Sequence, residues 1–551
     1  MRTKHFILAL AAMLGAQPLF AEDGSATVAT GQETKAADAT LFPIPKLSGP
    51  IWERERLLGD LGGPRQTLAD HGVQLEFGLV QVYQGVVGGG STEAWSQAVT
   101  QSSIKALTGA LVDPVSQRLE ILTSAQAQQR INLLSKGARL IFARLPEGKQ
   151  EVIRKKIAFV PAAAWSKIAT RVDQAFVNNV DRIEKELAKI VRGRAAGLTI
   201  GSFDNNSLDR LGYQGSWKGE LMLDLHKMGL WQGGFIYADL EGQYGDSVSK
   251  KSGALSPLSV DGNLPEPGID DVTVPFVFLT QFLSEKLAVT VGKIPLQYDN
   301  NEFAYITRDE RFLGAAFAIN LVTARSMPYS SLGATINYLP TKDLTLMFTA
   351  YDADGLPTRS GFDTVFNGIT GYAGEGRLTT RFGGLTGHHT LGGTYVTGSM
   401  LSLDQNPLAL IPGTGVDLKT RDSTWCVYYN FDQYLWQPDR KKPRGFGVFG
   451  RVGFADEKTS PSSQYYSFGF GGKGAFQSRP YDRWGVGGYY LKTSRDLPDY
   501  LQFGDEKGVE AFYTFAVTPA CLITADVQVV NSARKDVDTA TIIGMRVTMR
   551  F

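Results

Sequence analysis

The feature that most constrains the fold of this chain is an alternation of apolar and polar side chains with a period of two. In the last segment, one face carries Thr541, Ile543, Met545, Val547, Met549 and Phe551, and the other carries Gly544, Arg546, Thr548 and Arg550. A period of two is that of a β-strand, whose successive side chains point to opposite faces. Because arginine is costly in hydrocarbon, the second face must contact water, whereas the first suits lipid. Such a strand indicates a transmembrane β-barrel.

The same alternation recurs in segments that start near residues 74, 217, 344, 375, 446, 509 and 523. Short connections near 226–229, 284–286, 340–343, 386–388 and 438–440 alternate with longer loops near 245–270, 297–328, 354–370, 402–421, 456–463 and 493–506. Short turns at one end and long loops at the other are typical of outer-membrane barrels. The segments predict an all-β membrane protein, a sixteen-stranded antiparallel transmembrane β-barrel. A barrel of that size leaves a water-filled channel.

The N-terminus predicts export. Arg2 and Lys4 precede an apolar run, and small residues lead to a cleavage position after Ala21. This is the pattern of a cleavable signal peptide, and no later run of about 18 apolar residues predicts a membrane helix. We expect a signal peptide at 1–21, a periplasmic segment with a short helix at 22–72, a first barrel strand at 73–91, an α-helical insertion at 92–197 and the rest of the barrel at 198–551.

The insertion after the first strand differs from the barrel in period and charge. Apolar residues recur every three or four positions from Ile168 to Ile190, which is the period of a helix. The segment has 17 lysines and arginines and 9 aspartates and glutamates, so it is basic although the whole chain has a net charge of only +1. We expect it outside the cell, where it would cap the channel mouth, meet lipid phosphates, or be a loop insertion with a solvated charged face.

The side of the strands that faces the channel predicts the residues that contact solute. It carries charges of both signs, namely Lys218, Glu220, Glu375, Arg377, Arg381, Arg451, Glu510 and Arg546. Opposite charges in pairs leave little net barrier to a neutral solute, whereas a ring of one sign would select ions. The loop at 297–328 is expected to fold inward, because it carries Glu302, Phe303, Arg308, Arg311 and Arg325. The alternatives are an exposed loop and ion pairs that only stiffen the wall.

Several motifs resemble those of carbohydrate-selective outer-membrane porins of the OprB type. The N-terminal signature of that family is matched at 58–65, 68–69 and 72–73, with Leu61 in place of the usual tryptophan. Further matches lie at 291–293, 301–304, 351–355, 447–454 and 478–482, and the chain ends on Phe551. The resemblance covers most of the chain except 92–197. It implies a sixteen-stranded outer-membrane barrel, narrowed by inward loops, that passes sugars such as glucose by diffusion. The terminal Phe551 resembles the signal that the barrel-assembly machinery reads.

Other functions remain alternatives. A general porin or one for anions or other small solutes is possible, given the arginines. A barrel enzyme is disfavoured: His388 and His389 are adjacent and would face opposite ways on a strand, and no nucleophile–base pair is evident. We therefore expect no enzyme activity, no cofactor, no metal and no nucleic-acid partner. The expected partners are outer-membrane lipid and small sugars, and the chain would act as a monomer or a homotrimer.

Overall fold

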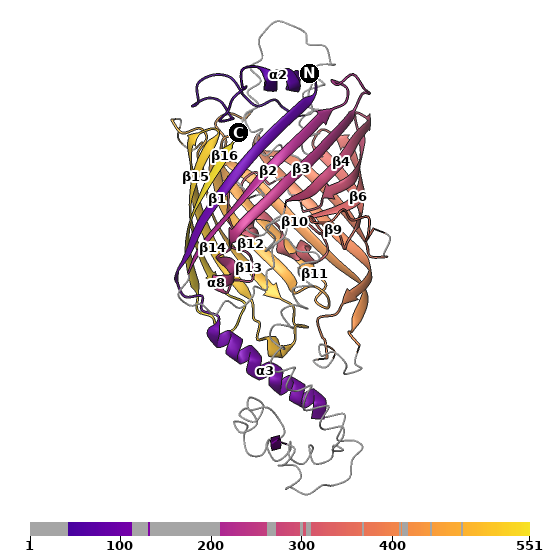
Figure 1. The fold of residues 1–551 in the computed structure, drawn as a ribbon, viewed down its shortest axis with the longest axis vertical. Helices are drawn as coiled ribbons and strands as arrows, with labels where there is room; N and C mark the ends of the chain where they lie inside the picture. Colours follow the sequence, from indigo (N-terminus) through magenta and orange to yellow (C-terminus); the bar gives the residue numbers. More distant parts are fainter. Residues whose placement is uncertain are drawn as a thin grey trace.

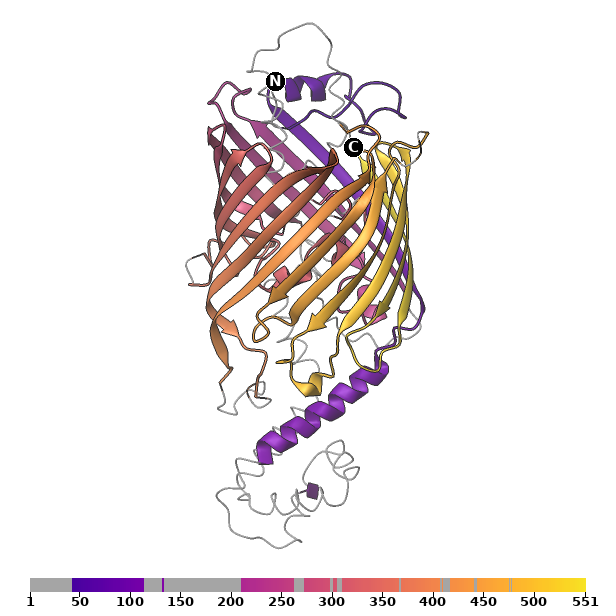
Figure 2. The ribbon, with the colours of Figure 1, turned by 180° about the vertical axis from the view of Figure 1, so that it is seen from behind.

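The protein folds as one closed barrel. The computed structural model describes residues 42–112, 131–132, 210–261, 272–297, 301–304, 310–365, 368–406, 409, 417–440, 443–474, 476 and 478–551. Sixteen strands pair in chain order, and the last pairs with the first to close the sheet (Figures 1 and 2). Every pairing is antiparallel, for example Val80 with Thr548 between the first and last strands. The predicted sixteen-stranded antiparallel barrel is confirmed.

The strands are β1 (Val73–Gly88), β2 (Leu211–Asp224), β3 (Gly234–Asp246), β4 (Thr273–Ser284), β5 (Leu287–Pro295), β6 (Ser330–Thr341), β7 (Leu344–Asp352), β8 (Thr370–Phe382), β9 (Leu385–Leu401), β10 (Thr420–Trp436), β11 (Gly445–Ala455), β12 (Ser462–Lys473), β13 (Arg483–Thr493), β14 (Glu506–Thr518), β15 (Cys521–Asn531) and β16 (Ala540–Arg550). The helices are α2 (Pro64–Asp70), α3 (Glu93–Val112), α8 (Ser249–Ser252) and α9 (Ala315–Ala318), with 3-10 turns η2 (Leu321–Arg325) and η4 (Asp499–Leu501). Among the residues described, no helix combines the length and apolar character needed to cross a membrane.

The alternation in the sequence maps directly onto the two faces of the wall. On β16, Met545 is 44% exposed on the outside, whereas Arg546 is 0% exposed on the inside. The same contrast separates Val509 from Glu510 on β14 and Val527 from Asp526 on β15. The outer face is therefore a continuous apolar surface, as lipid requires.

The two ends of the barrel differ. One end carries the short turns, α2 and Phe551, and we call it the turn end; the other carries the long loops and α3, and we call it the loop end (Figures 1 and 2). Phe551 donates its backbone N–H to the carbonyl of Phe77 at 2.9 Å, and the two rings lie 5.8 Å apart. The last residue is thus built into the seam between β1 and β16.

The N-terminal segment packs on the turn end. Arg56 is 2% exposed and forms an ion pair with Glu76 of β1, which Arg65 of α2 also contacts at 3.2 Å. Arg56 and Arg65 thus connect the N-terminal segment to β1. Leu61, which stands where the resembling family has tryptophan, is 59% exposed and has a φ of 53°. The proposed signal peptide at 1–21 lies outside the described residues.

The motif at 478–482 forms a turn that is fixed by one carboxylate. Arg479 donates to both oxygens of Asp482 at 2.7 and 2.9 Å, and Asp482 also accepts from Tyr513 and from the N–H of Ala516. Burial of Asp482 raises its pKa, but these hydrogen bonds lower it more, so the pKa lies below its ordinary value. The turn is therefore tied to β14.

The start of the insertion packs against the loop end. Trp95 of α3 is 2% exposed, donates to the carbonyl of Leu501 at 3.1 Å and lies 5.5 Å from the ring of Phe503. The guanidinium of Arg534 lies 4.9 Å from the Trp95 ring centre. Residues 113–130 and 133–209, with the helical pattern from Ile168 to Ile190, lie outside the described residues.

Candidate functional site

The loop between β5 and β6 folds into the barrel. Its described residues, 296–297, 301–304 and 310–329, include α9 and η2, and every residue of these two short elements is buried (Figure 2). The loop packs on the inner faces of β10–β16 and β1, which we call the filled side. The inner faces of β4–β8 on the opposite part of the wall are called the open side.

Glycines on the filled side make room for the loop. A side-chain carbon at Gly471 would lie 2.8 Å from Phe303, one at Gly485 would lie 2.9 Å from Phe312, and one at Gly487 would lie 2.6 Å from Phe317. Contacts that short do not occur between real carbon atoms. Part of the chain's high glycine content, 61 residues, therefore serves close packing of the loop against the wall.

Charged residues of the filled side bind the backbone of this loop. Arg451 donates to the carbonyls of Phe317, at 2.7 Å, and Ala304. Arg546 donates to the carbonyl of Arg311 at 2.6 Å. Arg451 and Arg546 are 3% and 0% exposed. They do not line an open passage, in contrast to the sequence expectation, because the loop covers them.

A second loop also enters the barrel. Residues 247–261, between β3 and β4, include α8, and the backbone N–H of Val260 donates to the carbonyl of Leu313 at 2.8 Å. The N–H of Ala315 donates in turn to the carbonyl of Pro257 at 2.9 Å. The two inward loops are therefore joined to each other. The sequence marked this segment only as a long loop.

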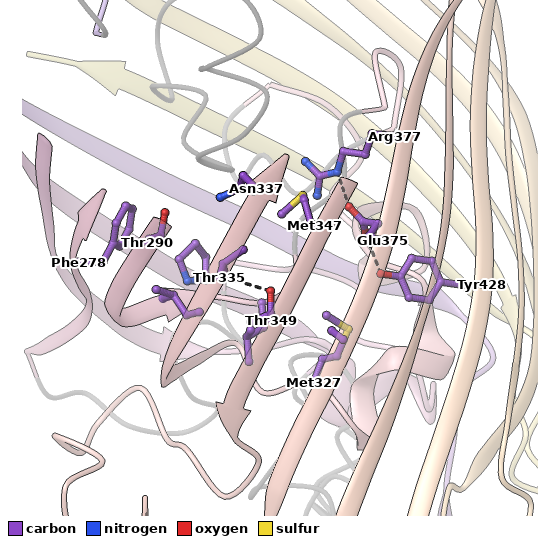
Figure 3. A pocket seen from close by; sticks show the side chains of 14 residues that line it. Phe278, Thr290, Met327, Thr335, Asn337, Met347, Thr349, Glu375, Arg377 and Tyr428 are labelled. Carbon is purple, nitrogen blue, oxygen red and sulfur yellow. Dashed lines mark hydrogen bonds and ion pairs between the residues drawn. The ribbon is translucent and has the colours of Figure 1, made fainter. Parts of the chain in front are cut away.

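The open side keeps a cavity next to the inward loop. It is lined by Phe278, Thr290, Ile294, Pro295, Leu296, Met327, Thr335, Asn337, Met347, Thr349, Ala373, Glu375, Arg377 and Tyr428 (Figure 3). When the space that is open to solvent at its mouth is included, the cavity has a volume of about 600 Å³. Leu296, Met327 and Tyr428 also line an adjoining smaller cavity beside Asn320 and Asn430.

A compensated pair of charges lies on the wall of the larger cavity. Glu375 and Arg377, two residues apart on β8, form an ion pair, and Tyr428 of β10 donates to Glu375 at 2.7 Å (Figure 3). Asn337 is 1% exposed, and its side-chain oxygen has no partner among the residues described. Met327, Met347 and Phe278 add apolar surface. The cavity thus offers donors, acceptors and apolar faces with little net charge.

An acidic cluster lies beside the cavity on β2 and β3. Lys218 contacts Asp239 at 2.8 Å and Glu220 at 3.1 Å, and Tyr237 donates to Glu220. The Tyr237 ring stacks on Phe278 at 5.3 Å, and this connects the cluster to the cavity. Lys218 and Glu220 therefore lie on the inner face, paired with each other.

The other residues predicted from the sequence occupy different places. Glu302 accepts from Tyr434 at 3.1 Å, and Phe303 is 4% exposed. Arg311 and Arg325 are both buried; they donate to the carbonyls of Asn301, at 2.9 Å, and Thr459, at 3.1 Å. Phe303, Arg311 and Arg325 thus hold the loop rather than face a passage.

Three predicted residues remain. Arg381 pairs with Asp343 at 2.8 Å in the turn at the turn end, with half of its side chain exposed, so it lies away from the cavity. Glu510 of β14 is buried against the inward loop. Arg308 lies outside the described residues. Sequence reasoning missed Tyr428, although it shares the inner face of β10 with Cys426 and Asn430.

Lys293 of β5 lies at an outward position, in line with Val291 on the same strand and opposite the exposed Val277 of β4. Its ammonium donates to the carbonyls of Val274, Pro357 and Arg359 at 3.0, 2.7 and 2.6 Å. The loop between β7 and β8 thus covers it from outside, and no bulge turns it inward. Among the described residues, no group of three or more histidine, cysteine, aspartate or glutamate side chains could hold a metal ion.

Comparisons with known proteins agree with the barrel. A solved structure titled "High pH structure of Pseudomonas putida OprB" matches with a TM-score of 0.62 and 16% identity, covering 91% of this chain and 99% of that one. The low-pH structure of the same protein matches with a TM-score of 0.45 and 12% identity over the same shares. The first of these matches supports the fold.

Sequence comparisons identify the family. A protein of Acinetobacter baylyi named "Putative porin QuiX" is 24% identical over 257 residues, which are 41% of this chain and 56% of that protein. The chain thus spans little more than half the length of this relative. Residues 209–551 match the family described as "Carbohydrate-selective porin, OprB family". The chain therefore belongs to the OprB family of carbohydrate-selective porins, whose fold implies a place in the outer membrane.

Proposed function

We propose that the protein is a channel for passive diffusion of carbohydrates such as glucose through a water-filled pore narrowed by its inward loops. The observation that carries this proposal is the cavity on the open side, where Glu375 and Arg377 neutralise each other and Tyr428 adds a hydroxyl. A sugar presents hydroxyls that donate and accept, together with apolar C–H faces. The polar groups match the hydroxyls, and Phe278, Met327 and Met347 match the C–H faces. No enzyme activity is part of this proposal.

The placement in the cell follows from the two ends. We propose that residues 1–21 direct export, that the turn end faces the periplasm, and that the loop end with α3 and the insertion faces outward. The basic insertion would then lie close to the phosphate groups of the outer leaflet. Phe551, built into the closing seam, would be read by the barrel-assembly machinery. Each chain encloses its own pore, whether it acts as a monomer or within a homotrimer.

The proposal is tested by liposome swelling with sugars and with uncharged non-sugar solutes of matched size. Sugars should enter faster than the matched solutes. Rates that depend only on solute size, with no difference between a sugar and its matched solute, would indicate a general porin instead. Faster entry of small anions than of sugars would indicate an anion channel.

The Glu375–Arg377 pair allows a sharper test. Glu375→Gln leaves Arg377 uncompensated and should favour anions, whereas Arg377→Gln should favour cations. Two unit charges that lie 4 Å apart in water interact with an energy of about 1 kcal/mol. Loss of one charge of the pair should therefore change the anion-to-cation permeability ratio roughly fivefold. Reversal potentials in planar bilayers measure that ratio. Shifts of the same sign in both variants would show that solute does not pass this pair.

A further inference from the structure

The inner face of β14 presents two buried glutamates to the two inward loops. Glu506 and Glu510 lie four residues apart, so both side chains point into the barrel. They are 0% and 3% exposed. A buried carboxylate needs several donors, and both of these obtain them from loop backbone.

Each glutamate accepts from two consecutive backbone N–H groups. Glu506 accepts from Leu255 and from Ser256, the latter at 2.9 Å. Glu510 accepts from Leu313 at 2.5 Å and from Gly314 at 3.1 Å. One strand therefore holds both inward loops, at positions where the loops are also hydrogen-bonded to each other.

The close approach at Glu510 depends on a glycine. A side-chain carbon on Gly314 would lie 2.5 Å from the nearer carboxylate oxygen of Glu510. With any larger residue at 314, either the loop or the Glu510 carboxylate must move, and either movement separates the carboxylate from the N–H of residue 314. The sequence of the loop is thus matched to the strand that holds it.

We infer that Glu506 and Glu510 are positioning residues that set the upper size limit of the pore. The inference rests on the proposed function as a diffusion channel. The two carboxylates hold the loops against the filled side, and the remaining space on the open side is what a solute can use. When the carboxylates are lost, the loops leave the wall and the opening is no longer defined.

The test uses the full chain with Glu506→Gln, Glu510→Gln and the double variant. A glutamine keeps the shape, but its NH2 group cannot accept from an N–H, so one bond of each pair is replaced by a contact between two donors. Because a buried N–H is left without its acceptor, the ratio of held to displaced loop should change by about tenfold at each site. Swelling rates with a series of malto-oligosaccharides and polyethylene glycols report the size limit.

We expect the double variant to admit oligomers that the parent protein excludes, while entry of glucose changes much less. Glu76→Gln is the matched control: it removes a buried inner-face carboxylate that binds Arg56 and Arg65 rather than the inward loops. It should leave the size limit unchanged. Far-UV circular dichroism and heat-dependent migration on gels verify that each barrel is folded.

Gly314→Ala is a second route to the same result, because it separates the loop from the Glu510 carboxylate and keeps both glutamates. If the double variant does not fold, Gly314→Ala and Glu506→Gln decide the question. An unchanged size limit in these folded proteins would overturn the inference, even where sugars are still preferred. The converse result, a changed size limit for polyethylene glycols without sugar preference in the parent protein, would refute the proposed function and leave the inference standing.

Discussion

The filled side and the open side of the barrel use the same kinds of residue for different purposes. On the filled side, Arg451, Arg546 and Glu510 are bonded to loop backbone and shielded from solvent. On the open side, Glu375 and Arg377 are bonded to each other beside a cavity. The alternation of apolar and polar residues along a strand therefore predicts which way a side chain points. Whether that side chain meets water depends on a loop far away in the sequence.

Residue size explains why the loop lies where it does. The inner faces of β11–β13 carry glycines at the positions under Phe303, Phe312 and Phe317. At the cavity, the open side carries Thr290, Thr335, Thr349 and Asn337 instead, and their side chains line the space beside the loop. Thr335 and Thr349 bond to each other at 2.9 Å across β6 and β7. Small residues on one side and medium polar ones on the other make the channel asymmetric.

The largest effect on this asymmetry is expected from Arg451→Ala. The change leaves the carbonyls of Phe317 and Ala304 without their donor inside the barrel. Each buried group left unsatisfied costs about 1–3 kcal/mol, which is enough to displace the loop in much of the population. Single-channel recordings should then show a higher and noisier conductance, and thermal unfolding should begin at a lower temperature.

Arg377→Ala is the matched control on the open side, since it also removes one inner-face arginine. It should change ion preference, while the conductance noise stays at the parent level. If Arg451→Ala altered only ion preference, Arg451 would act as a pore-lining charge. That result would contradict the different roles assigned to the two sides.

A smaller effect, in the opposite direction, is expected from Gly487→Ala. The new methyl group would lie 2.6 Å from the Phe317 ring, so the loop must move toward the open side. Overpacking of this kind costs about 1–3 kcal/mol. The conductance should fall, and entry of glucose into liposomes should slow.

Gly488→Ala provides the control, because Gly488 is the next residue on the same strand but faces outward. Its nearest neighbour would be Val509 at 3.6 Å, an ordinary contact. This variant should conduct like the parent protein. Equal conductance of the two variants would show that Phe317 is not held against β13.

The sequence predicted the wall of the barrel well, since its physics is local. Alternation at 541–551 placed Arg546 inside and Met545 outside without reference to any other segment, and the structure agrees. The inward course of the loop at 297–328 was also expected from its charges and aromatic rings. These features are determined by residues that are close together in the chain.

The detailed site was harder to predict from the sequence, because it depends on contacts between segments that are far apart in the chain. Phe303 and Arg546 were expected to face solute, but the loop and the wall bury one another. Tyr428 was missed because nothing near it in the sequence indicates that β10 reaches Glu375 of β8. One signal was available: Gly447, Gly471, Gly485 and Gly487 share the inner face of three consecutive strands, and glycine there indicates close approach of another segment.

The smallest effect on the pore is expected from Trp95→Ala, which tests how far the filled side extends beyond the barrel. Trp95 packs on the loops before β14 and between β15 and β16, through Phe503 and Arg534. Truncation of a buried tryptophan costs about 3–5 kcal/mol, and most of that loss should fall on the docking of α3. Protease should therefore cut the insertion faster, whereas the conductance should change little. Gln101→Ala, at an exposed position of the same helix, should resist protease like the parent protein. If Trp95→Ala instead altered the size limit, α3 and the inward loops would be coupled through the 494–505 loop that leads into Glu506. The filled side would then behave as one unit that includes α3 and the inward loops.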